Sequence, residues 1–358
     1  MKTVMIFAGG TGGHVFPALA VADALRAIHV GVVWVGTEKG LEARVVPAAG
    51  FPIEWIRIRG LRRQSVADRL LLPARLALSV MQAWRIFRRH RPNAALALGG
   101  FVAGPGGIAA WLTGTPLIIH EQNARAGLTN RWLALVATRV LTGFPGAFKE
   151  VPGAVQIGNP VRADILRLPK PEERLREHTP PLRLLVIGGS QGAMALNQTV
   201  PAALALMPPD ARPVVRHQCG IRHLDPTQAD YARHGVQAEI VPFFDDMAAA
   251  YAWADVVICR AGAMTISEIC AVGVAAVLVP FPHAADDHQT ANARFLADRG
   301  AALYVPQDEF TATRVAEILS GFVHNPAVAH NMALASHACA IPDATDRIVQ
   351  SCLEVMHA

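Results

Sequence analysis

Short apolar runs alternate with longer amphipathic segments along almost the whole chain. In the first half, strand-like runs at 3–8, 32–36, 53–57, 94–98, 117–120 and 155–157 are separated by helical patterns at 15–27, 71–90, 102–113 and 127–137. In the second half, strands are expected at 183–188, 213–217, 238–241, 255–259, 276–279 and 302–305, with helices at 192–206, 246–253, 264–272, 288–298, 312–320, 325–338 and 344–357. Such alternation predicts parallel sheets in doubly wound α/β domains.

Two domains are expected, because 358 residues exceed what one ordinary core organises. The turn Gly158-Asn159-Pro160 is followed by 164–181, a segment rich in charge and proline that is typical of a linker. The predicted boundary therefore lies near residue 162, with a first domain at 1–162 and a second at 163–341. The N-terminus enters a strand directly after Lys2, so no signal peptide is expected.

The stretch 92–119 imitates a membrane span because it contains no charged side chain. It is interrupted by glycines and prolines, so it is interpreted as a strand, a glycine loop, a helix and a second strand. The five cysteines are scattered without a CxxC pair. This predicts free thiols in a reducing compartment and no zinc site.

Positive charge is concentrated in one segment. The formal net charge is +5, and nine arginines but only one acid, Asp68, lie between Arg59 and Arg91, interleaved with apolar residues. An anionic membrane surface is the favoured partner of this segment, since each basic residue near such a surface contributes about 1 kcal/mol. A solvated helix face and an acidic soluble partner remain open. Nucleic acid is not expected, because no aromatic-basic platform accompanies the arginines.

Two glycine-rich loops follow buried strands and open helices. The first, 8–14, has four glycines and ends in His14; the second is Gly188-Gly189-Ser190-Gln191-Gly192. Exposed backbone N–H groups at a helix N-terminus form an anion site, and a histidine can titrate near neutral pH. The second loop alone could be a tight turn. The first lacks the third glycine of GxGxxG, and no GxxxxGK[ST] occurs, which argues against a nicotinamide cofactor and excludes a P-loop kinase.

Three further clusters follow strands. In 259–268, Arg260 is placed to face phosphates, and Glu268 is either a stabilising helix-end charge or an acceptor for two ribose hydroxyls. In 280–292, the two histidines and two aspartates could hold a metal, but one short loop would have to supply every ligand and no DxD pair occurs. A loop of amides and imidazoles that binds a sugar is favoured. The run 120–123 either caps the next helix or lines a cleft.

These motifs together resemble the MurG family of glycosyltransferases over nearly the whole length. The resemblance rests on GGTGGHVFPALA (9–20), GGFVAGPGG (99–107), HEQN (120–123), AGLTN (126–130), GNPVR (158–162), GGSQGA (188–193), 245–268, HAADDHQTANA (283–293) and IPDAT (341–345). It implies a GT-B fold of two Rossmann-like domains. It also implies inverting, metal-independent and cofactor-free transfer of N-acetylglucosamine from UDP-N-acetylglucosamine to a lipid-linked N-acetylmuramoyl-pentapeptide. The family acts as a peripheral protein at the cytoplasmic face of the bacterial membrane.

The resemblance also assigns roles to residues. Domain 1–162, completed by the final helix 342–358, would bind acceptor and membrane, and 163–341 would bind the donor. The expected donor-binding residues are Thr11, Gly12, Gly13, Asn123, Arg162, Ser190, Phe244, Arg260, Ala263, Met264, Thr265, Ile266, Ser267, Glu268, Gln289 and Asn292. Phe244 and Ala261 depart from the isoleucine and serine frequent in the family. Other cell-wall synthesis proteins are further expected partners.

The expected reaction is attack of the C4 hydroxyl of the muramoyl sugar on C1 of the donor, opposite UDP. His14 is the first candidate for the general base and Glu121 the second. Helix N-termini and Arg260 would stabilise the departing UDP. The alternatives are a UDP-sugar epimerase of the same architecture and a non-enzymatic membrane-surface scaffold.

Overall fold

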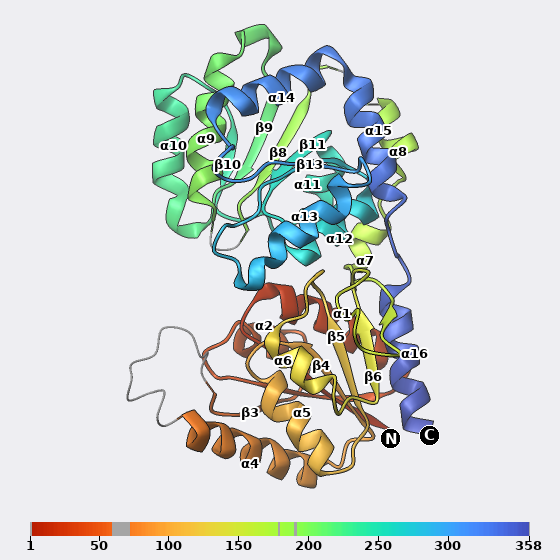
Figure 1. The fold of residues 1–358 in the computed structure, drawn as a ribbon. Helices are drawn as coiled ribbons and strands as arrows, with labels where there is room; N and C mark the ends of the chain where they lie inside the picture. The colour runs from red at the N-terminus through yellow and green to blue at the C-terminus, as the bar shows by residue number, and fades with distance from the viewer. Residues whose placement is uncertain (1, 59–71, 178–179, 190–191, 358) are drawn as a thin grey trace. The chain divides into compact units, whose positions relative to one another are not determined.

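The computed structural model describes residues 2–58, 72–177, 180–189 and 192–357. The chain divides into two compact units (Figure 1). Unit 1 comprises Met1–Arg162 and Ile341–Ala358, and unit 2 comprises Ala163–Ala340. Each unit is built on a parallel sheet, so the predicted fold class is confirmed.

The sheet of unit 1 has seven strands in the order β3-β2-β1-β4-β5-β6-β7, and all its pairings are parallel. The strands are β1 (Thr3–Ala8), β2 (Gly31–Gly36), β3 (Ile53–Trp55), β4 (Ala94–Gly99), β5 (Leu117–Glu121), β6 (Arg139–Thr142) and β7 (Val155–Gln156). The strand order reverses between β1 and β4. In doubly wound sheets, ligands bind at the carboxyl ends of the strands beside this switch point.

Alternating side chains of β1 bury against helices on both faces of this sheet. Met5 and Phe7 belong to the core under α4 and α5, whereas Val4, Ile6 and Ala8 belong to the core under α1 and α16. The helices of the unit are α1 (Gly12–Ala27), α2 (Glu42–Ala48), α4 (Leu72–His90), α5 (Ala103–Leu112), α6 (Leu128–Leu133) and α16 (Ala344–His357). Burial on both faces explains why these strands are continuous apolar runs.

The C-terminal helix α16 belongs to unit 1 although it follows all of unit 2 in the sequence. Ile348, Cys352 and Val355 lie in the same core as α1, and the two helices run side by side (Figure 1). Lys2 Nζ donates to the carbonyl of Met356 at 3.3 Å. The amphipathic pattern of 344–357 therefore finds its apolar partner on the first unit.

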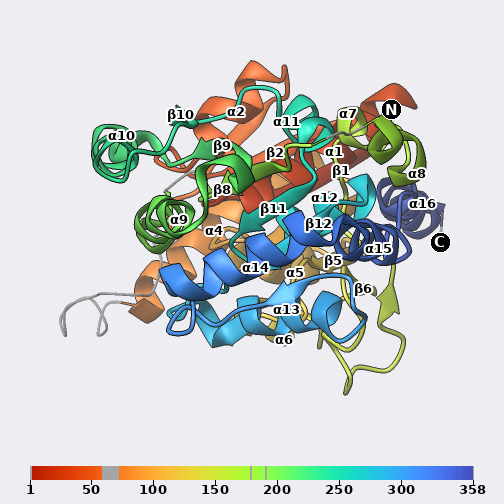
Figure 2. The same cartoon turned by 90° about the horizontal axis from the view of Figure 1, so that it is seen from above.

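Unit 2 has a six-stranded parallel sheet in the order β10-β9-β8-β11-β12-β13. Its strands are β8 (Arg183–Ile187), β9 (Val214–Gln218), β10 (Glu239–Val241), β11 (Val256–Cys259), β12 (Ala275–Leu278) and β13 (Leu303–Tyr304). Its main helices are α9 (Met194–Leu206), α10 (Leu224–Arg233), α11 (Met247–Trp253), α12 (Ala263–Val272), α13 (His288–Ala297), α14 (Ala312–His324) and α15 (Pro326–His337). Figure 2 shows α9, α14 and α15 in a row, and their apolar residues share one core with β8.

The prediction of a linker at 164–181 is wrong for the described residues of this segment, which fold onto unit 2. It contains α7 (Ala163–Leu166) and α8 (Pro171–Arg174). The Arg174 side chain is buried and donates to the carbonyls of Ala254 at 2.8 Å and Gly273 at 2.7 Å. A charge inside a proline-rich segment thus serves as an anchor here, because its guanidinium satisfies backbone acceptors of the sheet domain.

The uncharged stretch 92–119 folds as expected into β4, α5 and β5. Among the residues that the structure describes, no helix is long and apolar enough to cross a bilayer. Gly106 permits α5 to lie directly on β1, because a Cβ there would overlap the ring of Phe7. Gly106 therefore serves close packing of this helix on the sheet.

Candidate active site

The loop between β1 and α1 leaves backbone N–H groups exposed at the switch point of unit 1. Gly10 has φ +89°, and Thr11 is the extended N-cap of α1. The first turn contains Gly12 and Gly13 and no acidic residue. The first N–H groups of a helix have no intrahelical partner, and the helix dipole favours an anion there. This loop is therefore suited to bind a phosphate.

His14 lies between this loop and the loop that follows β4. Its Nδ1 is 3.2 Å from the Thr11 hydroxyl. On the other side, a Cβ at Gly99 would lie 2.6 Å from His14 Cδ2 and 2.8 Å from Nε2. Gly99 also has φ +106°, so a side chain here would be excluded on both grounds. The structure brings His14 to the switch point, and its role as general base stays a prediction.

Glu121, the second candidate base, is buried and fully engaged. One carboxylate oxygen accepts from the backbone and side-chain nitrogens of Asn123 at 3.0 and 3.1 Å. The other accepts from Gly127 N at 3.0 Å and Asn130 Nδ2 at 2.9 Å. Four donors around one buried carboxylate favour a role in holding the 122–127 loop rather than in proton transfer.

The rest of the 120–123 run also points inward. His120 is fully buried, its Nε2 lies 2.9 Å from the carbonyl of Gly158, and burial lowers the pKa of His120. Gln122 Nε2 donates to the carbonyl of Leu98 at 2.7 Å. Asn123 alone of the four is partly exposed. Of the two interpretations of this run, the structural one fits His120, Glu121 and Gln122, and the donor-binding role of Asn123 stays a prediction.

In unit 2, the corresponding loop joins β8 to α9. Gly189 and Gly192 have φ +77° and +75°, while Ser190 lies outside the described residues. A Cβ at Gly192 would overlap the carbonyl oxygen of Cys219 at the end of β9. That carbonyl accepts from Asn197 Nδ2 at 3.0 Å. The second glycine loop is thus packed against the end of the neighbouring strand.

A neutral network supports this packing. His217 Nε2 lies 3.0 Å from Asn197 Oδ1, and its Nδ1 lies 2.9 Å from the Tyr231 hydroxyl. Burial lowers the pKa of His217 to about 3. The imidazole is therefore neutral at physiological pH and holds α9 and α10 to β9.

The N-terminus of α12 forms the second element at the switch point of unit 2. Gly262 is its N-cap, and the buried Asn292 fixes the preceding turn by donating to the carbonyl of Ala261 at 3.1 Å. Ala263 and Ile266 are buried, so they can meet a ligand only through their backbone. Met264, Thr265, Ser267 and Glu268 are partly exposed.

A side chain of the neighbouring helix α11 holds Glu268 in place. Its Oε2 accepts from the hydroxyl of Tyr251 at 3.0 Å, and Tyr251 is fully buried in α11. Ser267 differs, because its hydroxyl donates to the carbonyl of Ala263 at 3.0 Å within the same helix. The hydrogen bond from a rigid tyrosine orients one carboxylate near the helix N-terminus, as binding of a diol requires.

Arg260 and Gln289 brace the turn that follows β12. Arg260 donates to the carbonyls of Val279 and Pro280, each at 3.1 Å, and to Gln307 at 2.6 Å. Burial lowers the pKa of Arg260. Gln289 Oε1 accepts from the backbone N–H of Phe281 at 2.9 Å. These contacts favour an anchoring role for Arg260 over the predicted one of facing the phosphates.

The remaining predicted residues lie in loops. Phe244 follows β10 and Arg162 ends the first segment of unit 1, and both are partly exposed. Within the described residues, no group of three or more histidine, cysteine or acidic side chains could hold a metal ion. In the 283–288 segment, the backbone of Asp286 and Asp287 is left-handed, with φ +52° and +53°.

Glu42 supports the first glycine loop, and the sequence patterns did not predict it as a site residue. Glu42 opens α2 and is fully buried. Its carboxylate accepts from Gly10 N at 2.9 Å, Thr37 N at 3.0 Å and Thr37 Oγ1 at 2.7 Å. An acid placed shortly after a buried strand and preceded by Gly36 and Gly40 was the available signal.

Two doubly wound units with a glycine loop after the first strand of each define a two-domain, nucleotide-binding class of α/β protein. Residues 4–142 match the Glycosyltransferase family 28 N-terminal domain, and residues 183–348 match the Glycosyltransferase family 28 C-terminal domain. The chain belongs to glycosyltransferase family 28.

Individual relatives are similar over the full length. The chain is 54% identical over 98% of both chains to the UDP-N-acetylglucosamine–N-acetylmuramyl-(pentapeptide) pyrophosphoryl-undecaprenol N-acetylglucosamine transferase of Alkalilimnicola ehrlichii. It is 51% identical to the protein of that name from Ralstonia nicotianae, over 100% of this chain and 97% of the relative. The crystal structure of Acinetobacter baumannii MurG superposes with a TM-score of 0.86 at 39% identity, covering 99% of this chain and 100% of that one. The resemblance to MurG is confirmed.

Proposed function

We propose that this protein transfers N-acetylglucosamine from UDP-N-acetylglucosamine to the C4 hydroxyl of N-acetylmuramic acid in an undecaprenyl-pyrophosphoryl-linked pentapeptide acceptor, a step of peptidoglycan synthesis. One observation carries the proposal. Relatives about half identical over nearly the whole of both chains bear the name of this transferase. The two glycine loops at the switch points supply the anion sites that a nucleotide diphosphate donor requires.

The two units divide the work in this proposal. Unit 2 binds the donor, with the N-terminus of α12 near the diphosphate and Glu268 on the ribose. Unit 1 binds the acceptor and carries the base. Support comes from the orientation of Glu268 by Tyr251 and from the place of His14 beside the first glycine loop. Phe244 and Gln289 are further proposed donor contacts of unit 2. The predicted donor contacts Thr11, Gly12, Gly13, Asn123 and Arg162 belong to unit 1, and Ser190 lies outside the described residues.

The chemistry is an in-line displacement at C1 of the donor. His14 removes the proton of the acceptor hydroxyl, which contributes roughly 10²–10⁴-fold to the rate. The departing diphosphate is stabilised by helix N-termini, each worth about 0.3–2 kcal/mol, so several must act together. Arg260 contributes by holding the 279–281 turn in place.

A UDP-sugar epimerase shares this architecture. The UDP-GlcNAc 2-epimerase of Neisseria meningitidis, solved with UDP-GlcNAc, superposes with a TM-score of 0.70 over 99% of this chain and 100% of that one, at 12% identity. Likeness at that identity concerns the fold alone, and no observation on this chain favours epimerisation. A non-enzymatic scaffold leaves both glycine loops and the full-length similarity to transferases unexplained.

A transfer assay tests the proposal. Radiolabelled UDP-N-acetylglucosamine is incubated with the protein and a short-chain, lipid-linked muramoyl-pentapeptide acceptor, with and without a chelator. Label is expected in the lipid product at the same rate in both conditions. Label that appears in a UDP-sugar isomer without acceptor would establish the epimerase instead. Absence of label from the lipid product refutes the transferase proposal.

The proposal includes a peripheral position at the cytoplasmic face of an anionic membrane, through a surface on α4 and α5. Ala83, Ile86 and Phe87 bury one side of α4, while Met81 and Trp84 are exposed on the other. An apolar groove of about 580 Å³ is lined by Pro73, Leu76, Ala77, Val80, Met81 and Trp84 of α4 and by Ile108 and Leu112 of α5. Exposed apolar side chains that line one groove are typical of an interaction site.

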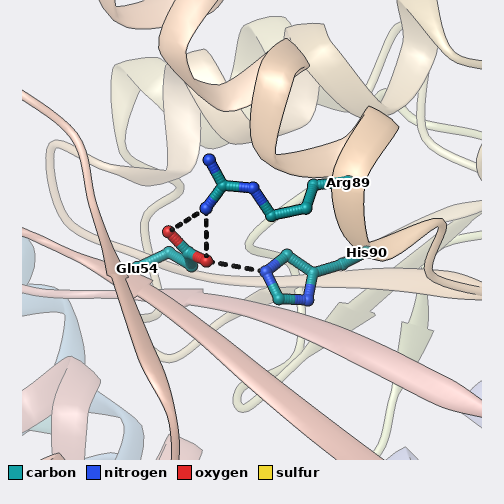
Figure 3. A network of polar contacts seen from close by, with 3 residues as sticks. All are labelled: Glu54, Arg89 and His90. Atoms are coloured by element: carbon teal, nitrogen blue, oxygen red, sulfur yellow. Dashed lines mark hydrogen bonds and ion pairs between the residues drawn. The ribbon is translucent and has the colours of Figure 1, made fainter.

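Exposed arginines lie on the same helix as the groove. The C-terminal end of α4 is held by a contact with the sheet. Arg75, Arg85 and Arg88 are exposed, and Arg88 lies over the ring of Trp84 at 5.6 Å. Figure 3 shows Glu54 of β3 between Arg89 and His90, at 3.1 Å from Arg89 Nη1 and 2.7 Å from His90 Nε2. The arginines 59, 62, 63 and 69 of the predicted basic segment lie outside the described residues.

Substitution of the groove tests the membrane position. The double variant Met81→Glu/Trp84→Glu is expected to bind vesicles containing anionic lipid about ten-fold or more weakly, since two apolar side chains lose their burial in lipid. Sedimentation with vesicles measures the binding. Leu206→Glu/Val328→Glu, which places the same two charges at exposed aliphatic residues of unit 2, is the matched control and should bind as the wild type does. Equal binding of all three proteins would refute the assignment of this surface.

A further inference from the structure

A buried carboxylate holds the first glycine loop from inside the protein. Glu42 is fully buried, and each of its oxygens has a defined partner. Oε2 accepts from the backbone N–H of Gly10, and Oε1 accepts from both the backbone N–H and the hydroxyl of Thr37. Glu42 thereby joins the end of β2 to the loop that follows β1.

The surroundings of Glu42 are shaped to receive it. A Cβ added at Gly9 would lie 2.7 Å from its Oε1, and one at Gly36 would lie 2.7 Å from its Cγ. A Cβ at Gly40 would overlap the carboxylate itself. Three glycines from two loops therefore leave space for this one side chain, which fixes the distance between the loops.

The contact reaches the proposed base through two residues of backbone. Gly10, whose N–H Glu42 holds, precedes Thr11, the N-cap of α1. The Thr11 hydroxyl lies 3.2 Å from His14 Nδ1. The carbonyl of Gly9 in turn packs against Gly100, next to the Gly99 position over which the His14 ring lies. Any shift of Gly10 therefore moves the groups that orient the imidazole.

We propose that Glu42 is a positioning residue of the transfer reaction, which sets the conformation of the 9–11 loop and through it the place of His14. The proposal rests on the transferase function proposed above. An electrostatic role toward the donor is disfavoured by its sign, because a carboxylate beneath an anion-binding loop repels the phosphate that the loop would bind. The contribution of Glu42 is therefore geometric.

The decisive variant is Glu42→Gln. The amide keeps the size of the side chain but presents an N–H₂ group to one of its two backbone donors, so one side of the contact is lost. A displacement of the loop by a fraction of an ångström to 1 Å is expected to lower kcat roughly 10- to 100-fold. KM for UDP-N-acetylglucosamine should stay within about three-fold, since the nucleotide is held on unit 2. Glu38→Gln, which removes an exposed acid from the segment between β2 and α2, is the matched control and should match the wild type.

A double-variant cycle distinguishes positioning from a general loss of structure. In the background of His14→Ala, Glu42→Gln should lower kcat no further, because the group that it positions is already absent. Thermal unfolding of every variant is recorded alongside. The proposal is overturned if Glu42→Gln keeps kcat within about two-fold of the wild type, or if the two deficits multiply in the double variant.

A second pair of variants decides the matter if Glu42→Gln does not fold. Thr37→Val removes the hydroxyl that donates to Oε1, whereas Thr37→Ser keeps it. A lowered kcat in Thr37→Val that Thr37→Ser restores supports the proposal, and wild-type kcat in Thr37→Val contradicts it. The wild-type protein in the same assay reports on the transferase function separately, because its turnover does not depend on these ratios.

Discussion

The two glycine loops follow the first strand of their sheets in the same topology, yet different chemistry supports them. In unit 1, the buried carboxylate of Glu42 holds Gly10, and the loop ends in His14. In unit 2, the neutral pair His217 and Asn197 holds the carbonyl that Gly192 packs against. The same strand–loop–helix plan thus yields one loop that presents a titratable side chain and another that is braced by uncharged groups.

This difference agrees with the two separate roles proposed for the loops. A loop that only grips a phosphate needs backbone N–H groups and a rigid base, which a neutral network supplies. A loop that also carries a base needs a fixed side chain as well, and in unit 1 Thr11 and Gly99 flank His14 on two sides. The comparison predicts that substitutions in unit 1 act on turnover and those in unit 2 on donor affinity.

The largest effect is expected from His14→Ala. Loss of the proposed general base should lower kcat about 10²–10⁴-fold while UDP affinity changes little, because the proposed nucleotide site lies on unit 2. Steady-state kinetics and UDP titration calorimetry measure the two quantities. Turnover within about three-fold of the wild type would show that His14 is not the base. It would also contradict the proposal that the two loops differ in function.

Glu268→Gln should have the second largest effect, on affinity. A carboxylate that accepts hydrogen bonds from ribose hydroxyls contributes about 1.5–3 kcal/mol, so UDP should bind about ten- to a hundred-fold more weakly. Tyr251→Phe, which removes only the hydroxyl that orients Glu268, should weaken binding less. Glu309→Gln is the control at an exposed acid of unit 2. Unchanged UDP affinity in Glu268→Gln would show that this carboxylate is merely a helix-end charge.

The smallest effect concerns the pH dependence of stability. Burial lowers the pKa of His217 to about 3 and also lowers that of His120. The unfolded chain takes up these protons below the ordinary histidine pKa of about 6.5 while the folded chain does not, so stability is fully present above that pH and falls as the pH drops. For His217 the slope should approach about 1.4 kcal/mol per pH unit once the pH lies well below 6.5.

Urea unfolding between pH 6.5 and 5 measures this slope. His217→Gln should remove the part of this slope that one histidine contributes. His29→Gln, at an exposed turn, is the control and should leave the slope unchanged. A slope that His217→Gln leaves unchanged would mean that the network under the second loop is not held neutral.

Most of the fold could be predicted from the sequence because its strands are buried on both faces. The continuous apolar runs of β1, β4, β8 and β11 give the parallel sheets and the positions of both glycine loops. β6 was missed, since Arg139–Thr142 is short and only partly apolar. α2 and α10 were missed as well, because short helices with mixed faces carry little periodicity.

The candidate site was predictable where its residues adjoin glycines and was less so where polar side chains brace loops. His14 and Glu268 occupy the expected elements. The anchoring of Arg260 was hidden because its partner Gln307 lies 47 residues away. The partners of Glu121 lie within the next nine residues, but their convergence on one carboxylate depends on the fold of the 122–130 segment. Composition cannot tell a carboxylate that awaits a proton from one that is saturated by backbone donors.

A crystal structure with uridine diphosphate tests the central division of labour most directly. Density for the nucleotide is expected on unit 2, with the ribose hydroxyls on the Glu268 carboxylate and the diphosphate at the N-terminus of α12. Nucleotide bound only to the β1–α1 loop of unit 1, with Glu268 unoccupied, would contradict it.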